Sequence, residues 1–166
     1  DQFDTWIGNM DPPDHTRLRR LVNAAFTTPM VQAMRGEIER LIEELFATID
    51  SDQTIDFVHD FAYPLPATVI TEMLGLPSDQ LEQFKRWSDD IVGFIGAGRA
   101  SVDKAEAAQE SVSALTEYYR PIIEDRRRQP RQDLISALAT AQEQGDQLSE
   151  VEMLATSITL LSGGHE

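Results

Sequence analysis

Cysteine is absent from all 166 residues of this sequence. The absence excludes disulfide bonds, thiolate metal ligands and a cysteine nucleophile within these residues. It also fits a reducing compartment, and we expect a cytoplasmic protein. Positive charge is scarce, with 14 lysine and arginine residues against 29 acidic ones and a net charge of −15. A surface of this sign argues against nucleic-acid binding.

The motifs of several enzyme classes are also missing. The sequence has no Gly-x-Ser-x-Gly elbow, no Walker loop and no His-Glu-x-x-His pair, so no hydrolase, P-loop or zincin site is predicted. The glycines between 93 and 98 follow a helical pattern rather than a strand, which disfavours a dinucleotide-binding site. His59 lies between Asp56 and Asp60; a surface loop is favoured there over a metal site.

What is present is a succession of helical patterns, without a repeat, a low-complexity tract or a linker. We therefore expect an all-α fold and a single domain over residues 1–166. The loop 1–10 precedes the first helix, with Phe3 and Trp6 expected to be exposed, and Asp11 is the expected N-cap of that helix. The expected helices cover residues 11–26, 28–49, 61–74, 77–95, 101–128, 133–141 and 149–166.

The second of these helices has the clearest amphipathic pattern. Its apolar residues recur at helical spacing and predict one buried stripe: Val31, Met34, Ile38, Leu41, Leu45 and Ile49. The opposite face carries charged side chains, for which solvation is favoured over a functional role.

The stretch 149–166 has the most apolar helical pattern. Ser149 and Glu152 form a capping box at its start. Between residues 153 and 161, apolar side chains occupy most of the circumference, which is typical of a helix in the middle of a protein. The stretch is too short and too rich in hydroxyl groups to span a bilayer. The sequence ends two residues after Gly163 and Gly164 without a polar tail or a closing turn, so we interpret the chain as ending in mid-helix.

His15 and Arg19 lie one helical turn apart near the start of the first helix. At 100° per residue they flank its apolar stripe, whereas Arg17 and Arg20 point elsewhere. Such a pair suits a partly buried carboxylate or phosphate. On spacing alone, the alternative is favoured, in which His15 supports the helix start and Arg19 pairs with a nearby acidic side chain.

The last four residues, Gly163, Gly164, His165 and Glu166, are a second candidate site. Two glycines could open a groove beside the helix for a flat or diatomic ligand, with Glu166 as an acid that handles protons. A glycine C-cap on a helix that simply ends is equally compatible with these residues.

Three stretches, in this order, resemble a bacterial cytochrome P450. Residues 11–26 (DPPDHTRLRRLVNAAF) resemble helix C of that family, residues 60–77 (DFAYPLPATVITEMLGLP) resemble helix E and the segment after it, and residues 160–166 (LLSGGHE) resemble the middle of helix I. The resemblance implies a partial P450 fold, from helix C to helix I, truncated at both ends.

The resemblance also implies roles for the two candidate sites. His15 and Arg19 match the pair that binds the haem propionates. Gly163 and Gly164 match the oxygen-binding groove of helix I. Glu166 matches the acid that precedes the family's helix I threonine in proton delivery to bound dioxygen, and that threonine would be the next residue.

The same resemblance implies further surfaces. Residues 3–10 and 87–98 resemble regions that line the substrate pocket. Arg17 and Arg20 would lie nearer the surface where an electron donor docks, and a soluble ferredoxin-like protein is the expected donor. No membrane or nucleic-acid partner is expected.

Several elements of the family are missing from these residues: the cysteine thiolate that holds the haem iron, the Glu-x-x-Arg stretch of helix K, the N-terminal β-rich region and the first helices. The resemblance therefore implies the middle part of a haem-dependent monooxygenase, which uses dioxygen and two electrons to insert one oxygen atom into a small organic substrate. We expect the chain alone to be inactive and to fold poorly, because its last helix would expose apolar surface.

Two non-enzymatic functions stay open at this point. One is a degenerate helical module that binds a ligand or a partner, and the other is an all-α sensor domain of the transcription-regulator kind. The gene sequence beyond Glu166 separates them from the enzyme.

Overall fold

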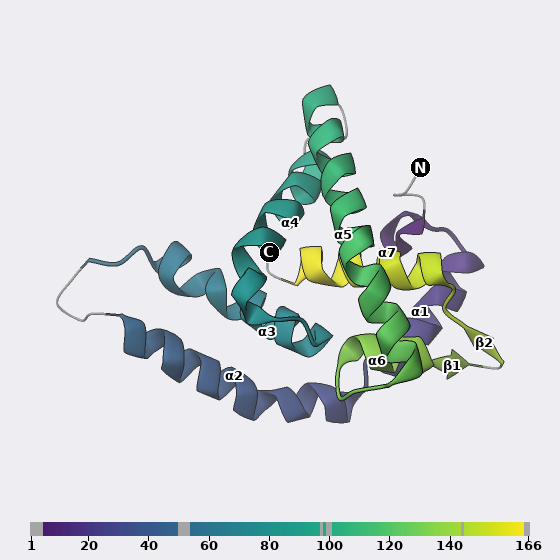
Figure 1. The fold of residues 1–166 in the computed structure, drawn as a ribbon, viewed down its shortest axis with the longest axis horizontal. Coiled ribbons are helices and arrows are strands. Elements are labelled where there is room, and N and C mark those ends of the chain that lie inside the picture. The colour runs from purple at the N-terminus through teal and green to yellow at the C-terminus, as the bar shows by residue number, and fades with distance from the viewer. Residues whose placement is uncertain (1–4, 50–53, 97, 99–100, 144, 165–166) are drawn as a thin grey trace.

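Seven α-helices make up most of the residues that the computed structural model describes, which are 5–49, 54–96, 98, 101–143 and 145–164 (Figure 1). The expected all-α class is confirmed. The bounds are α1 Asp14–Ala25, α2 Thr28–Thr48, α3 Pro64–Leu74, α4 Leu81–Gly96, α5 Val102–Arg128, α6 Leu134–Thr140 and α7 Glu150–Gly163. The shorter elements are 3-10 turns at Ile7–Asn9 and Ser78–Gln80, a π-helical turn at Val58–Ala62, and the strands β1 Gln142–Glu143 and β2 Asp146–Gln147.

Helix α7 crosses the middle of the molecule and packs against α3, α4, α5 and α6 (Figure 1). Helices α4 and α5 form the most extensive helix pair and project together from the rest of the fold, whereas α2 runs along its lower edge. Strands β1 and β2 pair antiparallel, with Gln142 opposite Gln147, and lead directly into α7. None of the helices within the described residues has the length and apolar composition needed to cross a membrane.

The capping box predicted for α7 is confirmed. The Ser149 side chain accepts a hydrogen bond from the Glu152 N–H at 3.3 Å, and the Glu152 carboxylate accepts one from the Ser149 N–H at 2.8 Å. Further along, α7 is buried on most of its circumference, and Met153 and Ile158 are at most 2% exposed. The interior position expected for this helix is therefore confirmed.

The start of α1 differs from the prediction. The helix begins at Asp14 with Pro13 in the N-cap position, and no side chain caps it. Asp11 contributes only its backbone oxygen, which accepts a hydrogen bond from the His15 N–H at 3.1 Å. A residue that precedes a proline avoids the helical conformation, so Pro12 delays the helix start. Trp6, predicted to be exposed, is only 7% exposed and belongs to the core; Phe3 lies outside the described residues.

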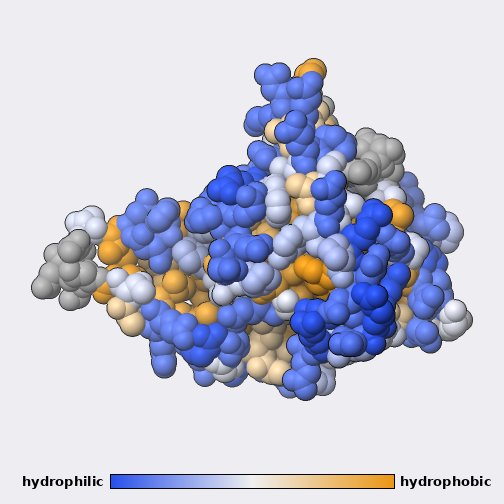
Figure 2. All heavy atoms as spheres, in the orientation of Figure 1, coloured by the Kyte–Doolittle hydropathy of each residue, from blue (hydrophilic) through white to orange (hydrophobic). Residues whose placement is uncertain are grey.

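The stripe predicted for α2 is buried at a single position, Leu41, and Val31 is 50% exposed. The reason is that α2 packs mainly against α3 and the π-helical turn, and its first turns face a hollow. Large exposed apolar side chains lie on α2 and the segment after it, including Phe46, Phe57 and Val58, and on α7 Val151 is 57% exposed. Figure 2 shows this apolar surface between α2 and α3.

Candidate functional site

The buried stripe of α1 is the one predicted, since Leu18, Leu21 and Ala25 are at most 5% exposed. It packs mainly against α6 and β1. His15 is half-buried beside this stripe, and Arg19, one turn further on, is exposed. Neither side chain forms a hydrogen bond or an ion pair with the described residues, so the pairing of Arg19 with a nearby acid is not found among them.

Arg17, which the helical wheel directed away from the interior, instead lies at the other edge of the stripe. Its side chain is 32% exposed and contacts two carboxylates, Asp146 of β2 at 3.0 Å and Glu152 of α7 at a shorter distance. The hydrogen bond from Arg17 lowers the pKa of Asp146. Arg17 therefore connects α1 to the start of α7.

The two glycines near the end of α7 have different surroundings. A Cβ atom on Gly163 would meet open space, whereas one on Gly164 would lie 2.5 Å from Cγ1 of Ile70 in α3. Gly164 has φ −88° and ψ −8°, which is a right-handed helical conformation rather than the left-handed one of a glycine C-cap. Gly164 thus permits close packing of α7 on α3, and Gly163 leaves free space beside the helix. The remaining two residues, His165 and Glu166, lie outside the described part.

Helix α1 contacts the start of α7 through Arg17, whereas the two glycines lie at the end of α7. Arg17 reaches α7 at Glu152, and Gly163 follows eleven residues later, which is about 16 Å along a helix axis. His15 and Arg19 are on the helix near the first point, and no described hollow is lined by them together with the glycines.

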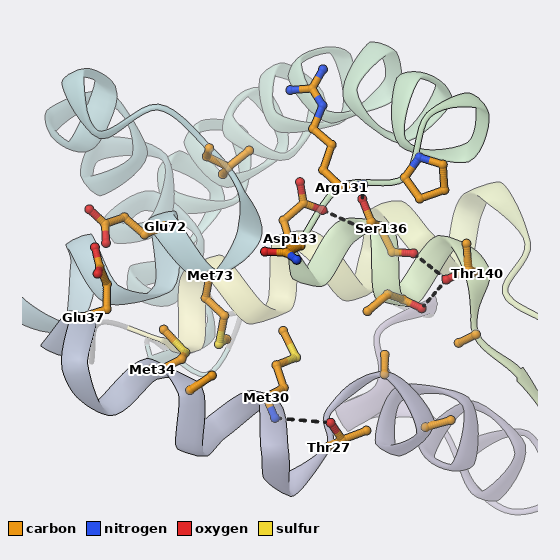
Figure 3. A pocket seen from close by; sticks show the side chains of 18 of the residues that line it. Thr27, Met30, Met34, Glu37, Glu72, Met73, Arg131, Asp133, Ser136 and Thr140 are labelled. Carbon is orange, nitrogen blue, oxygen red and sulfur yellow. Dashed lines mark hydrogen bonds between the residues drawn. The ribbon is translucent and has the colours of Figure 1, made fainter.

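Two hollows are present in the described structure. The smaller, of about 420 Å³, lies between the N-terminal loop, α5 and α7 and is lined by Thr5, Trp6, Thr116 and Leu154 among others. The larger, of about 1110 Å³, lies between the α1–α2 junction, α3 and α6. Figure 3 shows three methionines, Met30, Met34 and Met73, pointing into the larger hollow, with Glu37 and Glu72 at one end.

The segment 87–98, expected at a substrate pocket, does not line either of these two hollows, and its Trp87 belongs to an aromatic cluster. Trp87 packs against Phe84 and Tyr118, with ring centroids 6.1 Å apart in both pairs. The N-terminal loop does line the smaller hollow, through Thr5 and Trp6.

The sequence patterns gave no sign of a buried ion pair where the ends of α3 and α5 meet the start of α6. Arg126, at 5% exposure, donates to Asp133 at 2.6 Å and to the Gly75 carbonyl at 3.3 Å. Asp133 also caps α6 by accepting the Ser136 N–H at 2.7 Å. Gly75 has φ +73°, and a Cβ there would collide with Asp133. The run of arginines at 126–128 is thus in part structural.

Three hydroxyl groups in the interior, those of Tyr119, Thr156 and Ser157, have no hydrogen-bond partner among the described residues. Burial raises the pKa of Tyr119 far above its usual value, so its phenol stays protonated. His59 is exposed and contacts Asp60 at 2.9 Å, which raises the pKa of the imidazole. His59 and Asp60 lie in the π-helical turn Val58–Ala62 rather than in a loop, and no group of three potential metal ligands occurs within the described part of the chain.

Comparisons with known proteins agree with the resemblance. The family model for cytochrome P450 matches residues 4–166. Cytochrome P450 CYP107DY1 of Priestia megaterium is 38% identical over 169 residues, covering 97% of this chain and 40% of the relative. The 6-deoxyerythronolide B hydroxylase of Saccharopolyspora erythraea is 38% identical over 165 residues, covering 99% of this chain and 39% of that enzyme.

Comparison with solved structures also matches the chain to cytochromes P450. The solved structure of cytochrome P450 PksS from Bacillus subtilis matches with a TM-score of 0.88 and 35% identity, covering 100% of this chain and 41% of that one. The chain thus spans about two-fifths of the length of the relatives it matches. It belongs to the cytochrome P450 family.

Proposed function

We propose that this chain is the central part of a haem-dependent monooxygenase that oxidises a small organic substrate. The observation that carries the proposal is the family match along residues 4–166, together with relatives named as P450 hydroxylases and monooxygenases. Bound haem would supply the activation of dioxygen, with two electrons from a donor protein, so that one oxygen atom enters the substrate. A ferredoxin-like protein is the proposed donor.

His15 and Arg19 fit the acid groups of a haem. Both side chains project from one face of α1 at the edge of its buried stripe, and both lack a partner among the described residues. An unpaired guanidinium and an imidazole one turn apart can donate charge-assisted hydrogen bonds to two carboxylates. We assign the propionate-binding role to these two residues.

The end of α7 supplies the second part of the proposal. Gly163 leaves open space beside the helix, where a side chain would otherwise project, and Gly164 keeps α7 close to α3. We propose that this bare backbone gives dioxygen room beside the helix. Glu166 is the proposed acid that holds and passes a proton to this space.

The iron ligand would lie outside these residues, because the chain has no cysteine. The chain alone should therefore neither bind haem as a thiolate complex nor turn over. Purified chain mixed with haem, reduced and exposed to carbon monoxide should lack the thiolate-type Soret shift; its appearance would contradict the proposal. Reading the gene beyond Glu166 should reveal a threonine, then Glu-x-x-Arg, then a glycine-rich loop with cysteine.

Replacement of Arg19 by alanine tests the propionate site in the full-length protein. We expect haem loss to an excess of apomyoglobin to accelerate roughly tenfold or more, since hydrogen bonds to charged groups contribute about 1.5–3 kcal/mol. Arg20→Ala removes the same charge from the same helix and should leave the rate nearly unchanged. Arg17→Ala should have a smaller effect than Arg19→Ala; equal losses would contradict the helical-wheel assignment.

A further inference from the structure

Arg17 is the one arginine of α1 for which the described structure shows ion pairs. One arm of its guanidinium donates to Asp146 at 3.0 Å, and the other contacts Glu152. These partners follow Arg17 by 129 and 135 residues along the chain. The Glu152 side chain is only 14% exposed, so this contact is shielded from water more than an ordinary surface pair.

Glu152 uses its two carboxylate oxygens for different contacts. Oε2 accepts hydrogen bonds from the N–H and the hydroxyl of Ser149, at 2.8 and 2.9 Å, and completes the capping box. Oε1 is left for Arg17. Arg17 of α1 is thereby bonded to the same carboxylate that caps the N-terminus of α7.

The segment that carries both carboxylates is itself fixed. Asp146 is in β2, which pairs with β1 through the turn at Gly145, where φ is +83°. Arg127 of α5 donates to the backbone oxygen of Leu148 at 3.3 Å, and Leu148 is buried. Arg17 therefore contacts acceptors on a segment that is held by two other elements, β1 and α5.

Apolar packing alone does not define how α1 is rotated or shifted along its axis, because hydrophobic contacts are non-directional. Two charge-assisted hydrogen bonds to fixed carboxylates are directional and do define it. His15 and Arg19 lie two residues before and two residues after Arg17 on the same helix. Any rotation of α1 that Arg17 prevents would move both of them.

We propose that Arg17 is a positioning residue, which holds His15 and Arg19 at the haem edge by fixing α1 against β2 and the first turn of α7. This inference rests on the proposed haem function. Arg17 itself does not touch the cofactor; it acts through Asp146 and Glu152.

The test is a double-mutant cycle on haem loss in the full-length protein. Arg17→Gln and Asp146→Asn should each accelerate transfer of haem to apomyoglobin, Arg17→Gln by roughly fivefold, as expected for losing partly exposed ion pairs. The double variant should be no faster than Arg17→Gln, because both changes remove the same contact. If Arg17 bound haem directly, the two effects would multiply, and that result would overturn the proposal.

A second readout separates this proposal from the propionate assignment. Hydrogen exchange at the amides of Glu152 and Met153 should accelerate in Arg17→Gln and stay unchanged in Arg19→Ala and the same-helix control Arg20→Gln. Unchanged exchange and haem loss in Arg17→Gln, with rapid haem loss in Arg19→Ala, would overturn the positioning role alone. Slow haem loss in Arg19→Ala would overturn the propionate site and with it this inference, even if exchange changed in Arg17→Gln.

Discussion

Helices α7 and α2 both carry strong apolar patterns, yet the fold uses them differently. Eight of the 14 residues of α7 are buried, whereas Leu41 is the one buried residue among the 21 of α2. Helix α7 is surrounded by four other helices, while α2 contacts α3 and the π-helical turn. The comparison shows that periodicity predicts a helix and its apolar face, whereas the degree of burial depends on how many neighbours the fold places against that face.

The largest expected difference between the two helices is the cost of removing an apolar side chain. Ile158→Ala in α7 should lower the free energy of unfolding of the full-length protein by about 2–5 kcal/mol, because the side chain is 2% exposed and its removal leaves a cavity. Val31→Ala in α2, at 50% exposure, should change it by less than about 0.5 kcal/mol. Denaturant unfolding followed by circular dichroism measures both. Similar losses in the two variants would mean that α2 is covered as well as α7.

The glycines of α7 give a smaller and sharper test. Gly164→Ala should destabilise the full-length protein by about 1–3 kcal/mol, since the new Cβ would overlap Ile70 unless α7 and α3 separate. Gly163→Ala adds the same methyl group in open space and should be neutral or stabilise by up to about 1 kcal/mol. Thermal unfolding of the two variants, measured side by side, checks this. A reversed order would show that Gly163, rather than Gly164, is packed against a neighbour.

The smallest expected effect concerns the carboxylates that pair with arginines of α1 and α2. Arg17 lowers the pKa of Asp146. The ionised Asp146 carboxylate therefore stabilises the folded protein above about pH 4, and this stabilisation is lost as the pH falls through the lowered pKa. Burial raises the pKa of Glu72 despite the nearby Arg40, so the folded protein favours the protonated carboxyl group. The contribution of Glu72 to stability is therefore lost as the pH rises from 4.5 through the raised pKa. Carboxyl ¹³C NMR titration measures both groups. Arg17→Gln should return the pKa of Asp146 towards its usual value of 3.8 and leave the pKa of Glu72 unchanged.

Much of the fold could be predicted from local sequence signals. The capping box of Ser149 and Glu152 and the left-handed C-cap at Gly75 are formed by neighbouring residues, and the structure has both. The hidden position of Trp6 and the poor coverage of α2 depend on contacts between distant segments, which no local pattern contains. The start of α1 was missed because a Pro12–Pro13 pair is typical of a first helical turn, whereas here the helix begins after it.

The candidate site, like the fold, has parts that local sequence predicts and parts that depend on contacts between distant residues. His15, Arg19 and the glycine pair were found from spacing and from the resemblance, and their haem-related roles remain predictions. The role of Arg17 was missed because its partners lie more than 100 residues away. One signal was available: Arg17 is 40° from the stripe residue Leu21 on the helical wheel, which already places it at the edge of the buried face.

The junction of Gly75, Arg126 and Asp133 has a consequence for how this sequence can change over time. The carboxylate occupies the space that a side chain at position 75 would need, and the buried guanidinium depends on that carboxylate. A change at any one position leaves either a collision or an uncompensated charge in the interior. Substitutions at these three positions should therefore appear together in related chains, as a linked set inherited or replaced as a whole.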